Sequence, residues 1–281
     1  MTSWYCEELH SKVQQRLYVD KLLYRGRTDY QEIEIFENPL LGRVLVLDNI
    51  VQTTERDEFV YHEMLTHLPI LAHGAVRKVL IIGGGDGGIL EEVLKHPVET
   101  VTMVELDPKV VALCREYLSS ISGDAFDDPR CDLIFADGAA FVAEDERRYD
   151  LVVVDSPDPI GPAKVLFESP FYAGCRRCLA DGGILVTQNG VPFFQSEEVT
   201  STHASLKRLF AHTDFYVAPV PTYIGGHMTF GWASDGGDIR AVDRDTVAER
   251  YARSGLTTRY YNPDVHVAAF AIPNYIRELM V

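Results

Sequence analysis

The stretch VLIIGGGDGGILEEVLKH, residues 79–96, decides the fold. Gly83, Gly85 and Gly88 form a G-x-G-x-x-G pattern that follows an apolar strand and opens a helix. Glu105 comes about twenty residues later, at the expected end of the next strand, where a carboxylate can hold ribose hydroxyls. The stretch therefore predicts a nucleoside site, an architecture that dinucleotides and sulfonium nucleosides share.

Around this stretch, β-rich runs alternate with helical stretches, which is the pattern of a parallel sheet with crossover helices. The strand-like runs cover residues 78–82, 100–104, 131–135, 151–154 and 183–187. Two further runs, 213–220 and 228–233, flank a turn and predict an antiparallel end to the sheet. The predicted fold is α/β: a Rossmann-like, methyltransferase-type, mostly parallel sheet with a small N-terminal antiparallel β domain.

The N-terminal part of the chain has a different pattern. Residues 16–24, 31–37 and 43–53 are β-rich and are separated by Asp29, by Asn38-Pro39 and by Gly42. From Asp57 the apolar residues follow a helical period that ends at Gly74. We therefore expect an N-terminal β-strand domain over residues 1–56 and a Rossmann-like catalytic domain over residues 57–281.

Charge and composition exclude several classes of protein. The 281 residues carry 26 Lys and Arg against 42 Asp and Glu, a net charge of −16 that repels nucleic acid. The longest apolar run, residues 267–272, is far below the roughly twenty residues that cross a membrane. Glu7 and Glu8 stand where a signal peptide would be apolar, so we expect a cytoplasmic protein. We interpret Cys175 and Cys178 as thiols on a helix and not as a redox or zinc pair.

Four carboxylates follow successive strands of the predicted sheet: Asp86, Glu105, Asp137 and Asp155. The carboxyl ends of strands form the ligand crevice of an open α/β sheet. Asp86 would repel the pyrophosphate of a dinucleotide and attract a cation, although it could instead be a helix N-cap. Asp107-Pro108 is better explained as an N-cap followed by a first-turn proline. Glu105 and Asp137 are therefore predicted to hold a nucleoside, and Asp86, Asp155 and Asp158 to form an acidic pocket around an amine beside it.

Four long motifs stand in order along the chain: FENPLLGRVLVLDNIVQTTERDEFVYHEMLTHLP, the glycine stretch, VDSPDPIGPAKVLFESPFY and PTYIGGHMTFGWASD. On these motifs the sequence resembles the spermidine synthases, especially the bacterial ones, from about Trp4 to the C-terminus. The resemblance implies transfer of the aminopropyl group of decarboxylated S-adenosylmethionine to putrescine, which yields spermidine and 5′-methylthioadenosine. The nucleoside is a co-substrate, and the resemblance implies no cofactor and no metal.

The resemblance also implies roles for individual residues. Asp155 would be the proton acceptor, and His62 and Asp86 would contact the aminopropyl and polyamine portion. Without the resemblance, the pattern favours His62 as a buried core histidine, and Tyr61 and Tyr223 could equally be core rings. The implied nucleoside-binding residues are Gln31, Glu105, Asp137, Gly138 and Pro162; the implied polyamine-binding residues are Tyr61, His62, Asp86, Asp155, Ser156, Pro157, Asp158 and Tyr223, with Trp4 as a further possible wall.

The implied chemistry fits these residue types. An alkylamine with a pKa near 10.4 arrives protonated, so a base must take a proton before the nitrogen can attack. Crowding of Asp155 by Asp86 and Asp158 would raise its pKa toward that task. The prolines and glycine of residues 156–166 suit a shaped gate over the site.

The chain departs from the family pattern at three positions. Glu91 replaces an arginine, and we expect it to face away from the ligand. Asn49 replaces a glycine in LDNIVQ. Pro157 replaces a serine or threonine and removes a hydroxyl and a backbone donor beside Asp155, which bears on amine specificity more than on the reaction.

Three alternatives stay open from the residues. An S-adenosylmethionine-dependent methyltransferase would use the same glycine loop, but its cofactor carries a carboxylate that Asp86 would repel. A polyamine-binding protein without activity would not need Asp155. Agmatine, cadaverine, 1,3-diaminopropane or spermidine could replace putrescine, because the sequence does not reveal the distance between the anchors. We also expect a homodimer or homotetramer, since association would protect the N-terminal strand edges.

Overall fold

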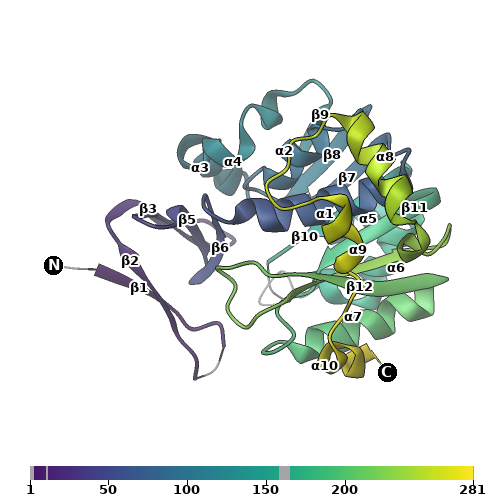
Figure 1. The fold of residues 1–281 in the computed structure, drawn as a ribbon. Coiled ribbons are helices and arrows are strands. Elements are labelled where there is room, and N and C mark those ends of the chain that lie inside the picture. The colour runs from purple at the N-terminus through teal and green to yellow at the C-terminus, as the bar shows by residue number, and fades with distance from the viewer. Residues whose placement is uncertain (1–2, 11, 158–164, 281) are drawn as a thin grey trace.

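Two small antiparallel sheets form the N-terminal part of the chain in the computed structural model, which describes residues 3–10, 12–157 and 165–280 (Figure 1). β1 (Ser3–Glu7) pairs with β2 (Gln15–Val19). A four-stranded sheet follows in the order β3-β4-β5-β6, with bounds Lys21–Arg27, Glu32–Asn38, Gly42–Leu47 and Ile50–Thr54. The predicted antiparallel region is thus confirmed.

The sequence predicted too few strands in this region. Residues 16–24 and 43–53 each contain two strands, and β1 was not predicted. The turn between β5 and β6 is made by Asp48 and Asn49, with φ of 46° and 63°. Asn and Asp adopt this left-handed conformation more readily than other residues with side chains, so the turn needs neither glycine nor proline. Asn49 therefore serves where the family pattern has glycine.

The first long helix, α1 (Glu58–His73), is buried on all sides. Every residue from 60 to 72 is buried, and the helix ends at Gly74, whose φ of 80° lets its N–H bond the carbonyl of Ile70. A helix that is apolar around most of its circumference belongs in the core. The helix predicted between Asp57 and Gly74 is confirmed, and it carries Tyr61 and His62 into the interior.

The large sheet has seven strands in the order β12-β13-β11-β10-β7-β8-β9. Five of them are parallel, and β12 and β13 are antiparallel, as predicted. The chain runs outward from β7 through β8 to β9 and then returns to the other side of β7 with β10. Ligands bind at such a switch point in open α/β sheets. Their bounds are β7 Lys78–Gly83, β8 Thr100–Glu105, β9 Cys131–Phe135, β10 Tyr149–Asp155, β11 Leu179–Gln188, β12 His212–Ala218 and β13 Met228–Ser234.

Helices cover both faces of this sheet (Figure 1). One core packs α1, α2 and the C-terminal segment against the sheet, and the other packs α5, α6 and α7. The helix that carries Cys175 and Cys178 ends at Cys178, because β11 begins at Leu179. The helices are α2 Gly88–Leu94, α3 Pro108–Tyr117, α4 Ser119–Ser122, α5 Gly138–Glu144, α6 Ser169–Cys178, α7 Ser196–Leu209, α8 Arg244–Ser254, α9 Pro263–Ala268 and α10 Asn274–Arg277, with 3-10 turns η1 Ala125–Asp127, η3 Ile239–Ala241 and η4 Glu278–Met280.

Within the described ranges, none of these helices has the length and apolar character needed to cross a lipid bilayer. Cys175 and Cys178 are free thiols, and both are buried on α6 as the sequence indicates.

Candidate active site

A cavity opens at the switch point between β7 and β10. Its walls come from the carboxyl ends of the parallel strands, from α1, from the N-terminal sheet and from the segment that carries Tyr223. The structure brings together on this cavity the predicted residues Gln31, Tyr61, His62, Asp86, Glu105, Asp137, Gly138, Asp155, Ser156, Pro157 and Tyr223. Asp158 and Pro162 lie outside the described residues, as does most of the predicted gate. Trp4 does not line the cavity and is half exposed on β1, which corrects its suggested role as a wall.

The glycine turn lets the backbone come close to neighbouring groups. A Cβ on Gly83, whose φ is 85°, would lie 2.0 Å from the carbonyl oxygen of Asp155. A Cβ on Gly88 would lie 2.1 Å from the ring of His62. Side chains at these two positions would therefore separate β7 from β10 and α2 from α1.

Asp86 lies within this turn and projects towards α1. Its Oδ1 accepts the N–H of Gly88 at 2.9 Å, while Oδ2 faces His62. The N-cap of α2 is Gly87, so the N-cap alternative for Asp86 is wrong. One carboxylate oxygen is left facing the cavity and the imidazole ring.

Glu105 and Gln31 lie on the side of the cavity predicted to hold the nucleoside. Glu105 is buried, and its Oε1 accepts the N–H of Asp107 at 2.9 Å. Burial raises the pKa of Glu105 to about 7 despite this hydrogen bond. Gln31 donates to the second carboxylate oxygen of Asp107 at 3.1 Å, and Asp107 caps α3 as predicted. Asp107 therefore links the N-terminal sheet to the end of β8.

Asp137 and Gly138 stand at the end of β9, where α5 begins. The Oδ1 of Asp137 accepts the N–H of Ala140 at 2.9 Å and caps the helix. Helix capping by Asp137 was not predicted, and Asp137 also lines the cavity. A Cβ on Gly138 would lie 2.6 Å from Ile82, so this residue must be small for α5 to approach β7.

Asp155 ends β10 directly opposite Gly83 of β7. Its Oδ1 accepts a hydrogen bond of 2.5 Å from the hydroxyl of Tyr61. Burial, together with the negative charge of Asp86, raises the pKa of Asp155 to about 6, although His62 and the Tyr61 hydroxyl act in the opposite direction. The carboxyl group is thus tuned towards accepting a proton near neutral pH.

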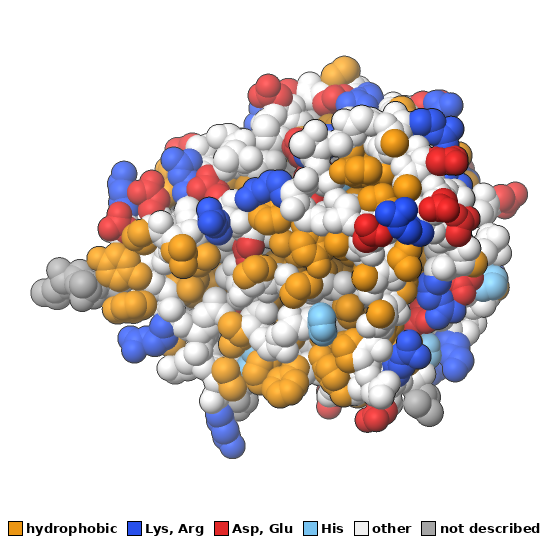
Figure 2. All heavy atoms as spheres, viewed as in Figure 1, with side chains coloured by type: hydrophobic (Ala, Val, Ile, Leu, Met, Phe, Trp, Pro, Cys, Tyr) orange, Lys and Arg blue, Asp and Glu red, His pale blue; other side chains and the backbone are white. Residues whose placement is uncertain are grey.

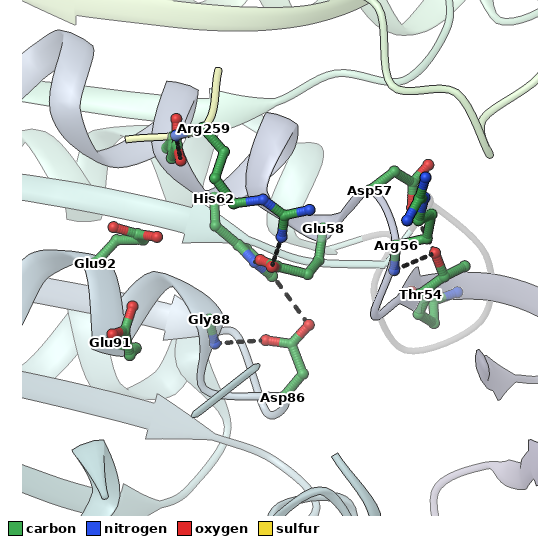
Figure 3. A network of polar contacts seen from close by, with 12 residues as sticks. Thr54, Arg56, Asp57, Glu58, His62, Asp86, Gly88, Glu91, Glu92 and Arg259 are labelled. Carbon is green, nitrogen blue, oxygen red and sulfur yellow. Dashed lines mark hydrogen bonds and ion pairs between the residues drawn. The ribbon is translucent and has the colours of Figure 1, made fainter. Parts of the chain in front are cut away.

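His62 lies between two carboxylates and is almost fully buried (Figure 3). Nδ1 is 2.8 Å from Glu58, and Nε2 is 3.4 Å from Asp86. Burial alone would lower the pKa of His62, but Asp86 and Glu58 outweigh it and raise the pKa well above the ordinary value. Both ring nitrogens therefore carry protons, which places a cation among the cavity acids.

These groups also bear on metal binding. One ligand atom each from His62, Asp86 and Asp155 would lie within 4.8 Å of one another. A metal ion needs a lone pair on the imidazole. Here both ring nitrogens face carboxylates as donors, so a metal would have to displace a proton that two negative charges hold.

Ser156, Pro157 and Tyr223 form the wall predicted to hold the diamine. The Oγ of Ser156 is buried and has no hydrogen-bond partner among the described residues. The backbone carbonyl of Ser156 accepts from Nε2 of Gln188 at 2.8 Å. The Tyr223 hydroxyl donates to the carbonyl of Gln52, which ties this wall to β6.

Glu91, which replaces the family's arginine, does not line the cavity and pairs with Lys95 at 2.8 Å, as expected.

Sequence reasoning missed Glu58 and Gln188. Glu58 stands four residues before His62, a spacing that pairs side chains on one helix face. Gln188 ends β11, so the rule that selected the acids at strand ends would have selected this amide as well. The spacing and the strand-end position were thus usable signals.

The charge of the cavity is one-sided. Among the described residues that line it, none is Lys or Arg, whereas six are Asp or Glu: Glu7, Asp48, Asp86, Glu105, Asp137 and Asp155. Such a wall favours cationic ligands and disfavours a dinucleotide pyrophosphate. The fold and the cavity define a nucleoside-dependent transferase of the methyltransferase-like α/β class.

Comparison with known families identifies the member of this class. Residues 58–245 match the spermine/spermidine synthase domain, and residues 3–55 match the spermidine synthase tetramerisation domain. The chain belongs to the spermine/spermidine synthase family and is an aminopropyltransferase. This confirms the resemblance and leaves the methyltransferase alternative without support.

Similar proteins cover nearly the whole chain. Polyamine aminopropyltransferase 1 of Pseudomonas aeruginosa is 56% identical over 273 residues, which are 97% of this chain and 96% of that relative. The polyamine aminopropyltransferase of Salmonella arizonae is 50% identical over 280 residues, 99% and 98% of the two chains. A spermidine synthase in complex with the transition state analogue AdoDATO superposes with a TM-score of 0.94 at 38% identity, covering 99% of this chain and 94% of that one. Spermidine synthase from Thermotoga maritima superposes with a TM-score of 0.91 at 37% identity, covering 99% of this chain and 94% of that one.

Proposed function

We propose that this enzyme transfers the aminopropyl group of decarboxylated S-adenosylmethionine to putrescine and releases spermidine and 5′-methylthioadenosine. The observation that carries the proposal is the pair of partly buried carboxylates, Asp86 and Asp155, in a cavity whose described wall has no Lys or Arg. Two cationic substrates would meet a wall on which carboxylates outnumber the one cation described above, His62. The names of the relatives and of the aligned structures support the same reaction.

The proposed nucleoside subsite lies at the end of β8. Glu105 would accept hydrogen bonds from ribose hydroxyls, and Asp137 would accept one from the adenine amino group. Gln31 would reach the nucleoside from the N-terminal sheet, and Gly138 would allow the base to approach the backbone. Pro162 is assigned to this subsite by the family resemblance alone.

The reaction needs a base and alignment. The acceptor ammonium gives one proton to Asp155, and the nitrogen lone pair then attacks the methylene carbon beside the sulfonium. The new C–N bond forms as the C–S bond breaks, and sulfur keeps the electron pair as a neutral thioether. The nitrogen thereby regains its positive charge. Because the sulfonium already leaves well, the protein mainly orients the reactants and excludes water.

Proton transfer to Asp155 is helped from both sides. A pKa of about 6 makes Asp155 a stronger base than an exposed aspartate. The neighbouring sulfonium lowers the pKa of the bound ammonium by repulsion. Asp86 would hold the aminopropyl ammonium, and Tyr61 would orient Asp155 through its 2.5 Å hydrogen bond.

No metal or redox cofactor is part of this proposal. The reaction involves no net oxidation or reduction, so it needs no redox cofactor. The sulfonium leaves without help from a Lewis acid, so it needs no metal ion. Removal of metals with a chelator should leave turnover unchanged, and a loss of more than about tenfold that Mg²⁺ or Zn²⁺ restores would overturn this part.

The acceptor is the least constrained part. Ser156, Pro157, Tyr223 and Asp158 would set the chain length of the amine, and cadaverine, agmatine, 1,3-diaminopropane and spermidine remain competitors. The test is to mix the enzyme with decarboxylated S-adenosylmethionine and each amine separately, and to follow methylthioadenosine and new polyamines by mass spectrometry. We expect the highest rate with putrescine. Methylthioadenosine formed only with another amine would replace the acceptor, and tight S-adenosylmethionine binding without methylthioadenosine would overturn the donor.

We further propose that the enzyme is a homodimer or homotetramer. Residues 3–55 match a tetramerisation domain, and Figure 2 shows hydrophobic side chains gathered over the N-terminal strands and the middle of one face, with charged side chains mostly towards its rim. A contiguous apolar face of this kind marks an interaction site. Light scattering at a mass of only 31.5 kDa would contradict association. We also propose that the enzyme is cytoplasmic, and cell fractionation tests this.

A further inference from the structure

Four charged side chains lie in sequence from the protein surface to the cavity (Figure 3). Nη1 of Arg259 is 3.8 Å from Oε1 of Glu58, and Oε2 of Glu58 is 2.8 Å from Nδ1 of His62. Nε2 of His62 is 3.4 Å from Oδ2 of Asp86. Charge therefore alternates along this row of four, and each group faces an opposite charge.

The outer end of the row is held by the C-terminal segment between α8 and α9. Glu63, buried on α1, accepts the backbone N–H groups of residues 259, 260 and 261 at 2.7, 2.8 and 2.7 Å. The guanidinium of Arg259 also stacks on Phe59, 3.7 Å from the ring centre. A segment far along the chain is thereby fixed against the first turn of α1, beside Glu58.

The orientation of His62 depends on Glu58. The ring is pressed against the backbone of Gly88, so it can rotate little. A neutral imidazole has one N–H donor and one lone pair, so it could donate to Glu58 or to Asp86 but not to both. A ring that donates only to Glu58 would direct its lone pair at the Asp86 carboxylate. The doubly protonated ring avoids this repulsion only while both carboxylates face it.

Asp86 in turn affects Asp155, because both are partly buried on the cavity wall and of like charge. The groups that face His62 are Glu58 and Tyr61 from α1, Asp86 from the glycine turn and Asp155 from the end of β10. The His62 cation is the only positive side chain among these five. Its loss would leave Asp86 and Asp155 facing each other without a cation until substrate arrives.

We propose that Glu58 is a positioning residue for aminopropyl transfer, which holds the His62 ring with Nε2–H directed at Asp86, and that Arg259 steadies Glu58 from the C-terminal segment. This rests on the proposed function, in which Asp86 holds the aminopropyl ammonium. Glu58 acts through His62 and Asp86, and neither Glu58 nor Arg259 lines the cavity.

The direct test is a titration of His62 by NMR in the substrate-free enzyme, compared with Glu58→Gln. The matched control is Glu99→Gln, which removes the same charge from an exposed Arg77–Glu99 pair remote from the cavity. We expect the His62 pKa to fall by about one unit or more in Glu58→Gln and to stay unchanged in Glu99→Gln. Equal titration of His62 in all three proteins would overturn the proposal. This readout does not need turnover, so it separates the proposal from a failure of the proposed function.

Kinetics give a second readout that a purely structural role would not move. In the wild-type enzyme Glu58 and Asp86 raise the pKa of His62, so the rate should show no fall in the pH range where an ordinary histidine loses its proton. Glu58→Gln should add a falling limb to the pH–rate profile and raise KM for decarboxylated S-adenosylmethionine by about tenfold. A profile that is uniformly scaled down, with no new limb, would contradict the proposal.

If Glu58→Gln does not fold, Arg259→Met keeps the proposal testable. Arg259 is about half exposed at its side chain, and loss of its positive charge would by itself raise the pKa of His62. A fall of the His62 pKa in Arg259→Met, smaller than in Glu58→Gln, would therefore report the release of Glu58, and Arg259→Lys should restore the pKa in part. If the His62 pKa does not fall in Arg259→Met, Arg259 does not steady Glu58. If Glu58→Gln also fails to fold, the same result overturns the proposal that Glu58 positions His62.

Discussion

The two edges of the seven-stranded sheet use carboxylates in opposite ways. At the amino edge, Asp145 pairs with Arg147 at 2.8 Å, and the same arginine reaches Asp132 at 3.1 Å. Asp150 accepts the backbone N–H groups at the start of β7 at 2.8 and 2.9 Å. At the carboxyl edge, Glu105 and Asp155 face a cavity whose described wall offers no Lys or Arg.

The pKa values of Asp145, Glu105 and Asp155 follow the same division. Burial would raise the pKa of Asp145, but hydrogen bonds from Arg147 and Tyr149 outweigh it and lower the pKa. Burial dominates for Glu105 and Asp155, whose pKa values rise to about 7 and about 6. Carboxylates at one edge therefore stabilise the fold, whereas those at the other lower its stability until a cationic ligand binds. Four predictions test this difference.

The largest effect is expected for Asp155→Asn on the rate. Without the base, kcat should fall by about 100- to 10,000-fold, while the Kd for methylthioadenosine changes little. Stopped assays and calorimetry measure the two quantities. Asp145→Asn, at the other edge, should keep kcat within about twofold. Equal small losses in both variants would mean that Asp155 has no catalytic role, as in a polyamine-binding protein.

Glu105→Ala should weaken nucleoside binding by about 10- to 100-fold, the usual cost of losing hydrogen bonds to a charged group. Calorimetry with methylthioadenosine measures this, and kcat at saturating donor should change much less. A variant that binds the nucleoside normally but turns over slowly would exchange the roles of Glu105 and Asp155.

Removal of charge should change stability in opposite directions at the two edges. The folded state holds a proton on Asp155 between about pH 4 and pH 6 that the unfolded state has released, so stability falls as pH rises through this window. Asp155→Asn should therefore raise the free energy of unfolding at about pH 8 by on the order of 2 kcal/mol, and by little at about pH 5. Asp145→Asn should lower it, by less than about 1 kcal/mol. Thermal melts at both pH values measure this, and a loss of stability in Asp155→Asn at the higher pH would contradict it.

The smallest effect concerns the pH–rate profile. Turnover should rise through an apparent pKa near 6 as Asp155 loses its proton. Asp86→Asn removes the repulsion that raises this value, so the midpoint should move down by about one unit. A midpoint that stays in place, or moves up, would show that Asp86 does not act on the base.

The comparison also shows how far the sequence could lead. Strand ends place side chains at one edge by chain geometry alone, so Asp86, Glu105, Asp137 and Asp155 were predictable as neighbours. The turn at Asp48-Asn49 was missed although Asp and Asn favour left-handed turns, because apolar strand residues stand directly on both sides of it. The Gln31–Asp107 contact and the approach of Arg259 to Glu58 join segments that no local pattern connects. The roles given to Asp158 and Pro162 stay predictions, as does the domain boundary at residue 56.

The contact between Tyr223 and Gln52 has a consequence for folding kinetics. The hydroxyl of Tyr223 bonds a carbonyl 171 positions earlier, and Asp57 accepts the N–H of Thr222 across 165 positions. Loops of this length close late, after helices and local hairpins have formed. After dilution from denaturant, far-ultraviolet circular dichroism should therefore recover before nucleoside binding, with catalytic turnover returning last.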